Sequence, residues 1–149
     1  MDGSVRFEVL DRGECLRLLG SVPIGRVVFS EHALPAAQPV GFALFDGAVV
    51  FRTATDSGLS AGVRGTVVAF EADEFDPVVG SGWSVLVVGT ASEVRDPEQL
   101  RLISGLPLRC WVPGRQEHVI RVSIDRVTGR RVECVPQNHL PHACHPSPG

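Results

Sequence analysis

The stretch DGAVVFRTATDSGL, residues 46–59, decides the fold of this chain. Asp46-Gly47 is typical of a two-residue hairpin turn, because both residues tolerate positive φ. The β-branched and apolar run at 48–53 therefore predicts an antiparallel return strand. A polar loop follows this strand and opens a short helix predicted at 57–63. The stretch indicates an antiparallel β fold, with polar groups gathered where one strand ends.

Three polar residues at this strand end, Arg52, Thr53 and Ser57, predict a pocket for a phosphorylated ligand. A guanidinium, two hydroxyls and the free N–H groups of a helix start are donors that phosphate binds well. The chain contains no lysine, so an anion site must depend on arginine and backbone. Two simpler interpretations stay open, because Arg52 could be a solvated surface residue and Ser57 only a helix N-cap.

Composition restricts the class of protein. A chain of 149 residues, 44% hydrophobic and 21% charged, fits one domain with a real core. The net charge of −3 disfavours nucleic-acid binding. The longest apolar runs, such as 85–88, are far shorter than a membrane span, and the N-terminus lacks the layout of a signal peptide. We therefore expect a cytoplasmic protein that binds neither nucleic acid nor membrane.

Turn signals and apolar periodicity divide the rest of the chain into strands and short helices. Asp11 and Glu14 form a capping box that predicts a helix ending near Gly20, and Asp96-Pro97 predicts another helix that runs to about Ser104. The predicted strands are 25–30, 38–44, 48–53, 66–72, 83–95, 118–125 and 128–133, and the longer loops are 31–37, 73–82 and 107–114. Gly89 predicts a bulge or bend within its strand.

These elements favour a mainly β (α+β) fold, with a six- to seven-stranded antiparallel β-barrel and two or three short helices. The barrel domain is expected to occupy residues 1–135, and the Pro- and His-rich segment 136–149 predicts a flexible tail. The four cysteines show no CxxC spacing, which favours reduced thiols. The spacing of Cys134, His139, His142, Cys144 and His145 matches no standard zinc site, so we predict no metal, with a metal-binding tail as a weaker alternative.

The order of segments resembles the pyridoxamine 5′-phosphate oxidase-like, FMN-binding split-barrel family. The resemblance covers roughly residues 10–133. The matching pieces are GRVVF at 25–29, QPVGF at 38–42, FRT at 51–53 with Ser57 and Leu59, VVAFEAD at 67–73, GWSV at 82–85 with Gly89, WVPG at 111–114 and TGRR at 128–131.

The resemblance implies an antiparallel split β-barrel that forms a homodimer, with FMN in two clefts at the subunit interface. It places Arg52, Thr53 and Ser57 at the phosphate and ribityl end. Trp111 would lie near the ring edge. The residues that it implies along the isoalloxazine ring are Pro39, Val40, Gly41 and Phe42. Trp83 and Ser84 would approach from the neighbouring strand, within the chain or across the dimer.

One departure from the family pattern concerns charge at the phosphate site. Gly58 stands where FMN-binding members usually have a lysine, and Asp56 stands where a glycine is common. The pocket is therefore two charges less positive. A charge-assisted hydrogen bond contributes about 1.5–3 kcal/mol, so the change could weaken FMN binding by roughly tenfold to a hundredfold. Arg64 could compensate, or the cofactor could be a deazaflavin or haem.

The leading functional hypothesis is an FMN-dependent oxidoreductase, with hydride transfer at the flavin ring and an unidentified small-molecule substrate. No side chain stands out as a general acid, base or nucleophile, so no catalytic residue is assigned. Backbone N–H groups around 40–42 are expected to contact the ring. The alternative is a non-catalytic carrier or sensor for flavin, deazaflavin or haem on the same fold.

Overall fold

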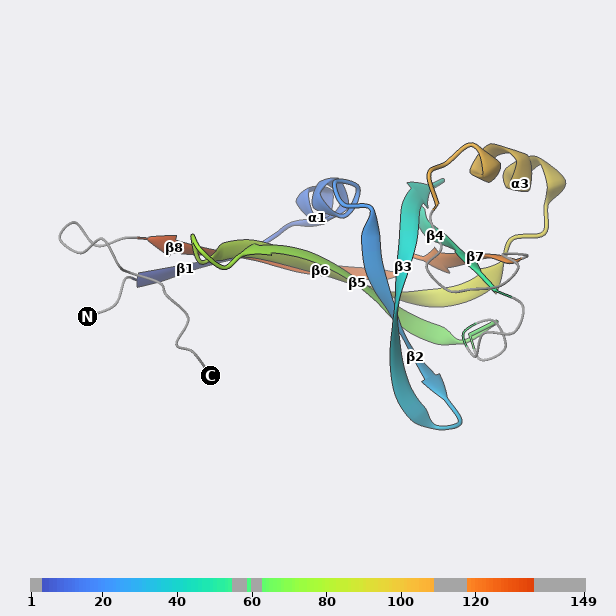
Figure 1. Cartoon of the computed structure of the whole chain (residues 1–149), viewed down its shortest axis with the longest axis horizontal. Coiled ribbons are helices and arrows are strands. Elements are labelled where there is room, and N and C mark those ends of the chain that lie inside the picture. The colour runs from blue at the N-terminus through green and yellow to red at the C-terminus, as the bar shows by residue number, and fades with distance from the viewer. Residues whose placement is uncertain (1–3, 55–58, 60–62, 109–117, 136–149) are drawn as a thin grey trace.

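The computed structural model describes residues 4–54, 59, 63–108 and 118–135, and it is an antiparallel β structure with two described helices (Figure 1). The helices are α1 (Arg12–Leu19) and α3 (Pro97–Ser104). The strands are β1 (Ser4–Val9), β2 (Ile24–Glu31), β3 (Leu34–Phe45), β4 (Ala48–Thr53), β5 (Val67–Asp76), β6 (Ser81–Glu93), β7 (His118–Ser123) and β8 (Arg126–Val135).

Six of the strands close into a barrel. The sheet order is β1-β8-β6-β5-β2-β3-β4-β7, and an additional pairing between β7 and β6 completes the ring. β8 and β1 extend the sheet beyond the ring, and with the ends of β5 and β6 they form the long arm on the left of Figure 1. The expected antiparallel β-barrel is therefore confirmed.

The barrel closes where β6 changes partner at Gly89. Residues 82–88 of β6 pair with β8, whereas 91–93 pair with β7. At the change, the Thr90 N–H donates to the Ser123 hydroxyl over 3.0 Å, and the Asp125 N–H donates to the Val88 carbonyl over 3.2 Å. A Cβ on Gly89 would overlap the Ser123 carbonyl oxygen. The predicted bend is thus a place where only glycine fits.

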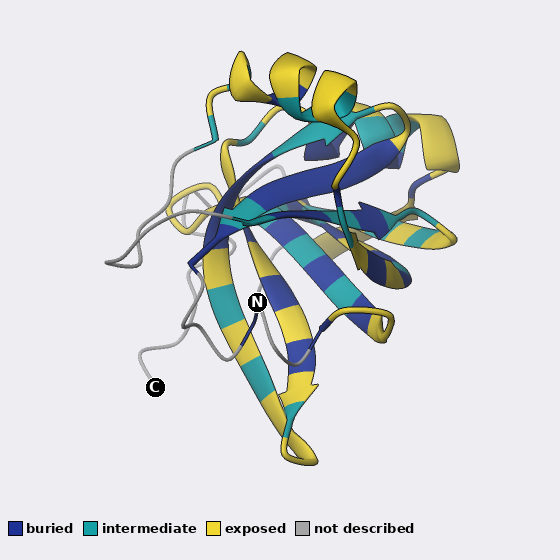
Figure 2. Ribbon diagram, turned by 90° about the vertical axis from the view of Figure 1, so that its right-hand side faces the viewer, coloured by how far each residue is buried: buried dark blue, intermediate teal, exposed yellow. Residues whose placement is uncertain are grey.

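Inward-facing residues of the strands form the core, and Figure 2 shows buried and exposed residues alternating along them. Phe42 and Phe70 meet edge to face inside the barrel, with ring centroids 4.6 Å apart. A second cluster, Val50, Val94, Ile103 and Val119, packs α3 against the outside of β4 and β7. The core therefore fixes β4 from both sides.

Both predicted helix starts are confirmed. The Asp11 carboxylate accepts from the Glu14 N–H over 2.8 Å, and the Asp96 carboxylate accepts from the Glu98 N–H over 3.3 Å. Glu14 itself binds Arg17 and Arg131, and these hydrogen bonds lower its pKa to about 2. Its link to Arg131 fastens α1 to one face of the arm.

Two predicted loops are wrong because strands continue through them. The segment 31–37 holds only a tight turn at His32-Ala33, whose φ angles of 50° and 64° suit a two-residue hairpin. The segment 73–82 continues β5 and β6, joined by a short turn that Asp76 caps by accepting from the Val78 N–H. β1 was not predicted at all.

Other expectations fall partly or wholly outside the described residues. The helix at 57–63 and the loop at 107–114 are described only at residues 59, 63, 107 and 108, and the tail 136–149 is not described. Cys15 is a free thiol, whereas Cys134 is disulfide-bonded, so the expectation of reduced thiols is wrong for Cys134. The connectivity of a disulfide cannot be deduced from a single sequence. None of the described helices is long and apolar enough to cross a membrane.

The junction at Gly89 yields a prediction with a matched control. Gly89→Ala should destabilise the protein by about 3 kcal/mol or more, because the methyl group meets a backbone carbonyl that cannot move without opening the barrel. Gly13→Ala, in α1, meets only ordinary contact at 3.6 Å and should stabilise by about 0.4–1 kcal/mol. Urea denaturation of both variants measures the difference. Equal stability of the two would contradict this account of barrel closure.

Candidate functional site

The barrel splits where β3 and β4 part. The two strands pair from Phe42↔Phe51 to Phe45↔Ala48, and the next pair, Gly41 with Arg52, is not part of the ladder. β4 continues along β7, whereas β3 continues along β2. Among the described strands, none pairs with the edge of β3 over residues 35–41 on the side away from β2. This edge is the candidate site.

Backbone alternation determines which groups face the open edge. The Phe42 N–H donates to the Pro23 carbonyl over 3.1 Å, so it points towards the β2 side. N–H groups alternate along a strand, so those of Val40 and Phe42 point towards β2 and that of Gly41 points into the split. Of the three backbone N–H groups expected near a ring, Gly41 supplies the one that faces the open edge.

The side chains of residues 39–42 alternate between the core and the other face of the sheet. Val40 and Phe42 are buried in the core, with exposed fractions of 3% and 4%. Pro39 pairs with Arg26 and is exposed on the other face. Pro39 also has no N–H to leave unsatisfied at the open edge. Gly41 is buried, whereas Pro39 is exposed, so a flat ligand along this edge would lie on Pro39 and reach only the backbone of Gly41, with Val40 and Phe42 forming the wall behind them.

Arg52 and Thr53 end β4 at the other side of the split. Successive strand residues project to opposite faces, so these two side chains diverge. Thr53 shares the barrel interior with Phe51, whereas Arg52 is half-buried on the same side as Val50, near α3. The Arg52 and Thr53 side chains can therefore contact the same ligand only if that ligand extends around the end of β4.

Thr53 carries the clearest sign of a missing ligand group. Its side chain is 1% exposed, and its hydroxyl has no hydrogen-bond partner within the part of the chain that the structure describes. An unsatisfied buried hydroxyl costs about 1–3 kcal/mol. A ligand oxygen at the barrel end would remove that cost.

A charged cluster lies beside Thr53. The sequence does not predict this cluster, although it indicates Arg64, one of its members, as a possible replacement for the missing lysine. His118 is the register partner of Thr53, and its Nδ1 contacts the Glu93 carboxylate. Arg64 Nη2 lies 3.3 Å from His118 Nδ1, and Arg95 Nε donates to Glu93 over 2.9 Å. Burial acts to raise the pKa of Glu93, but hydrogen bonds from His118 and Arg95 and the charge of Arg64 outweigh it and lower that pKa. This cluster brings guanidinium groups to the barrel end despite the absence of lysine.

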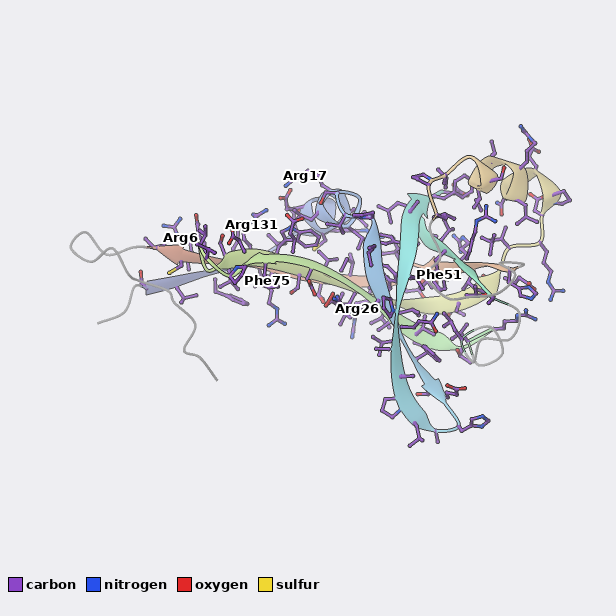
Figure 3. All side chains as sticks on the ribbon, viewed as in Figure 1. Arg6, Arg17, Arg26, Phe51, Phe75 and Arg131 are labelled. Atoms are coloured by element: carbon purple, nitrogen blue, oxygen red, sulfur yellow. The ribbon has the colours of Figure 1, made fainter. Side chains whose placement is uncertain are left out.

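Trp83 and Ser84 lie apart from the split within one chain. Along the row Pro39–Arg26–Glu71–Leu86, β6 is three strands from β3, or about 14 Å. Trp83 faces the α1 side of the arm and is 7% exposed, whereas Ser84 pairs with Asp73 on the opposite face. The two residues cannot both approach the same cleft from one face. Figure 3 shows this separation, with Phe51 in the barrel and Arg131, the register partner of Trp83, on the arm.

Ser57 and Trp111, the remaining predicted site residues, lie outside the described residues. Histidines 139, 142 and 145 of the predicted tail do so as well. Within the described ranges there is no group of three or more His, Cys, Asp or Glu side chains arranged to hold a metal.

Two hollows in the described surface lie outside the split. One of about 730 Å³ is next to Phe42 and Ile24 and continues past Pro107. Its volume suits a small molecule. The other, of about 580 Å³, lies on the arm beside Trp83 and Arg131. The hollow at Phe42 is lined from the β2 side of β3, and none of its lining residues belongs to the open edge at 35–41 or to the end of β4, so it lies outside the split.

The buried hydroxyl yields a direct prediction. Thr53→Val keeps the shape of the side chain and removes the unsatisfied hydroxyl, so the ligand-free protein should gain about 1–3 kcal/mol of stability. Thermal unfolding of ligand-free protein measures this change. A loss of stability would show that the hydroxyl has a partner within the protein.

Known proteins resemble this chain in sequence and in fold. Residues 11–131 match the pyridoxamine 5′-phosphate oxidase family. The uncharacterized protein Rv0080 of Mycobacterium tuberculosis is 46% identical over 128 residues, which are 83% of this chain and 84% of that protein. The FAD binding protein from Mycobacterium smegmatis is 36% identical, with a TM-score of 0.72 over 84% of this chain and 98% of its own. The protein of unknown function DIP1874 from Corynebacterium diphtheriae is 34% identical, with a TM-score of 0.70 over 87% and 98% of the chains. The chain thus belongs to the pyridoxamine 5′-phosphate oxidase-like family.

Proposed function

We propose that the protein is a flavin-binding oxidoreductase whose cofactor occupies the split between β3 and β4. The observation that carries the proposal is the open edge of β3 at Gly41, which lies across the split from Arg52 and from the Thr53 hydroxyl, for which the described residues provide no hydrogen-bond partner. A planar ring along the edge and an anionic group at the strand end match these two features. Membership of the family supports a flavin.

The expected flavin is FMN, and FAD is the alternative that two observations favour. The terminal phosphate of FMN carries close to two negative charges at neutral pH. The two phosphates of FAD are joined in a pyrophosphate and carry one charge each, so FAD places less charge at any one point and suits a site where Gly58 and Asp56 reduce the positive charge. A relative that is 36% identical is named for FAD binding.

A bound flavin would supply hydride transfer at its ring. The part of the chain would be to bind and orient the ring: the Gly41 N–H and Pro39 would hold it at the open edge, and Arg52 would offer charge to its anionic group. Residues 37–41 carry no titratable side chain, which is compatible with chemistry carried by the cofactor. The same absence is compatible with a non-catalytic carrier.

We further propose a homodimer formed through the outer face, which we define as the sheet face opposite α1. Alternate residues of a strand project to opposite faces, and register partners share a face. On this basis, eight of the twelve exposed large apolar side chains of the described residues lie on the outer face. They are Val5, Phe7, Val9, Ile24, Val28, Val67, Phe75 and Leu86. Pro39 and Ser84 share the face, so a second copy would bring its arm towards the split.

The flavin proposal is tested by releasing the bound small molecule from native protein and identifying it by mass. We expect FMN or FAD; a deazaflavin, haem or no ligand would contradict the proposal. Arg52→Ala should weaken binding of that flavin by more than tenfold, since it removes a charge-assisted contact. Arg101→Ala, an exposed arginine on α3, is the control and should leave affinity unchanged.

A reduction assay of the bound flavin distinguishes an oxidoreductase from a non-catalytic carrier. Bleaching of the flavin absorbance by NADH, NADPH or another hydride donor favours the oxidoreductase. Bound flavin that none of these donors reduces favours the carrier.

The dimer proposal predicts that Leu86→Glu dissociates the protein. Leu86 is 40% exposed at the centre of the outer face and is the register partner of Glu71, so docking would bury the new carboxylate beside another acid. The dimer dissociation constant should rise at least tenfold in sedimentation velocity. Leu102→Glu, on the exposed side of α3, should leave it unchanged. A monomeric wild-type protein at 100 μM would overturn the proposal.

A further inference from the structure

The outer face carries a compact charged cluster among its apolar residues. Arg26 Nη1 lies 3.5 Å from the Glu71 carboxylate and 3.4 Å from the Asp73 carboxylate, so one nitrogen faces both acids. Glu71 and Asp73 stand two residues apart on β5, and Arg26 comes from the neighbouring β2. The two carboxylates are 28% and 30% exposed, and Arg26 is 53% exposed. Figure 3 shows Arg26 where the arm meets the barrel.

The charges of this cluster do not cancel. With both acids ionised, one guanidinium faces two carboxylates and each chain carries a net −1 at this point. The surroundings add little compensation: Pro39, Ser84 and Leu86, the register partners from β3 and β6, are uncharged. Two further cations on the described face, Arg126 and Arg130, come from β8, beyond β6; the Arg130 guanidinium lies 5.8 Å from the Phe7 ring centre.

A second copy covering this face would make the excess charge costly. Docking removes water from all three groups, and an uncompensated carboxylate in a desolvated interface is strongly unfavourable. One proton per chain makes the cluster neutral and lets the two acids share a hydrogen bond. Already in one chain, burial raises the pKa of Glu71 to about 7, assisted by the hydrogen bond and charge of Asp73 and opposed by Arg26.

We propose that two copies of the chain dock over the Arg26–Glu71–Asp73 cluster, and that docking takes up about one proton per subunit, shared by Glu71 and Asp73. This inference rests on the proposed dimer and adds that pH controls the strength of dimerisation. Dimerisation is then favoured in acid. It weakens as the pH rises through the neutral range, where the monomer releases the proton that the dimer retains.

The size of the effect follows from proton number. Two protons per dimer change the dissociation constant by up to about a hundredfold per pH unit above the pKa of the monomer. If less than one full proton is taken up per subunit, the change is smaller. We therefore expect the dimer dissociation constant to rise at least tenfold between pH 6.0 and pH 8.5. Below pH 6.0 it should level off as long as no other group titrates.

The experiment is sedimentation velocity of the full chain between pH 6.0 and 8.5 at constant ionic strength. Glu71→Gln should abolish the pH dependence and hold the dissociation constant near its acid value, and Asp73→Asn should do the same. Glu74→Gln changes an exposed acid on the opposite face of the same strand and should keep the wild-type dependence. If the dimer is too tight to dissociate, the series is repeated in a Leu86→Ala background.

The outcomes separate this inference from the dimer itself. A monomer at every pH overturns both. A dimer whose dissociation constant changes less than threefold overturns the proton uptake alone. A pH dependence that survives both Glu71→Gln and Asp73→Asn shows that other groups are responsible. Calorimetric dilution in two buffers of different ionisation enthalpy counts the protons directly and should give one to two per dimer.

Discussion

The close approach of β6 to the end of β7 at Gly89 is the constraint on which the structure depends. Because Gly89 has no side chain, the Ser123 carbonyl can lie against it and β6 can exchange β8 for β7. That exchange closes six strands into a barrel and leaves β8 and β1 outside it. The closed barrel holds β4 against β7, and the extra strands build the outer face. Both the split and the face therefore originate from one backbone contact.

The split follows from how β4 is held. β4 pairs fully with β7 and packs against α3 through Val50, so it cannot follow β3 beyond Phe42. β3 in turn is held by β2 along its whole length before Phe42. Two rigid neighbours thus keep Gly41 and Arg52 apart, and the open edge needs no flexible segment to form. A site built on such strands is held in place before any ligand arrives.

Local sequence patterns were enough to predict most helices, strands and turns. Contacts between residues far apart in the sequence could not be predicted in this way. Asp46-Gly47, Asp11 and Asp96 act within a few residues, so their turn and caps could be foreseen. The alternation of Val5, Phe7 and Val9 was an available signal for β1, but an edge strand with an exposed face offers little burial to support it. His32-Ala33 lacks the usual turn residues, so the sequence predicts a loop there and not a hairpin. The pairing of Glu93 with His118 and of Arg26 with Glu71 depends on strand register, which the sequence does not state.

The composition of the chain determines where it can respond to pH. All fourteen basic residues are arginines, because lysine is absent. Arginine stays charged throughout the physiological range, so it binds anions without responding to protons. A pH response must therefore come from carboxyl groups, histidines or thiols. Glu71 is a carboxyl group of the described chain whose pKa lies near neutrality, and through Arg26 it shares a row with Pro39 at the split. The proposed cofactor edge and the proposed proton site thus lie on one sheet face, where a single docking event would cover both.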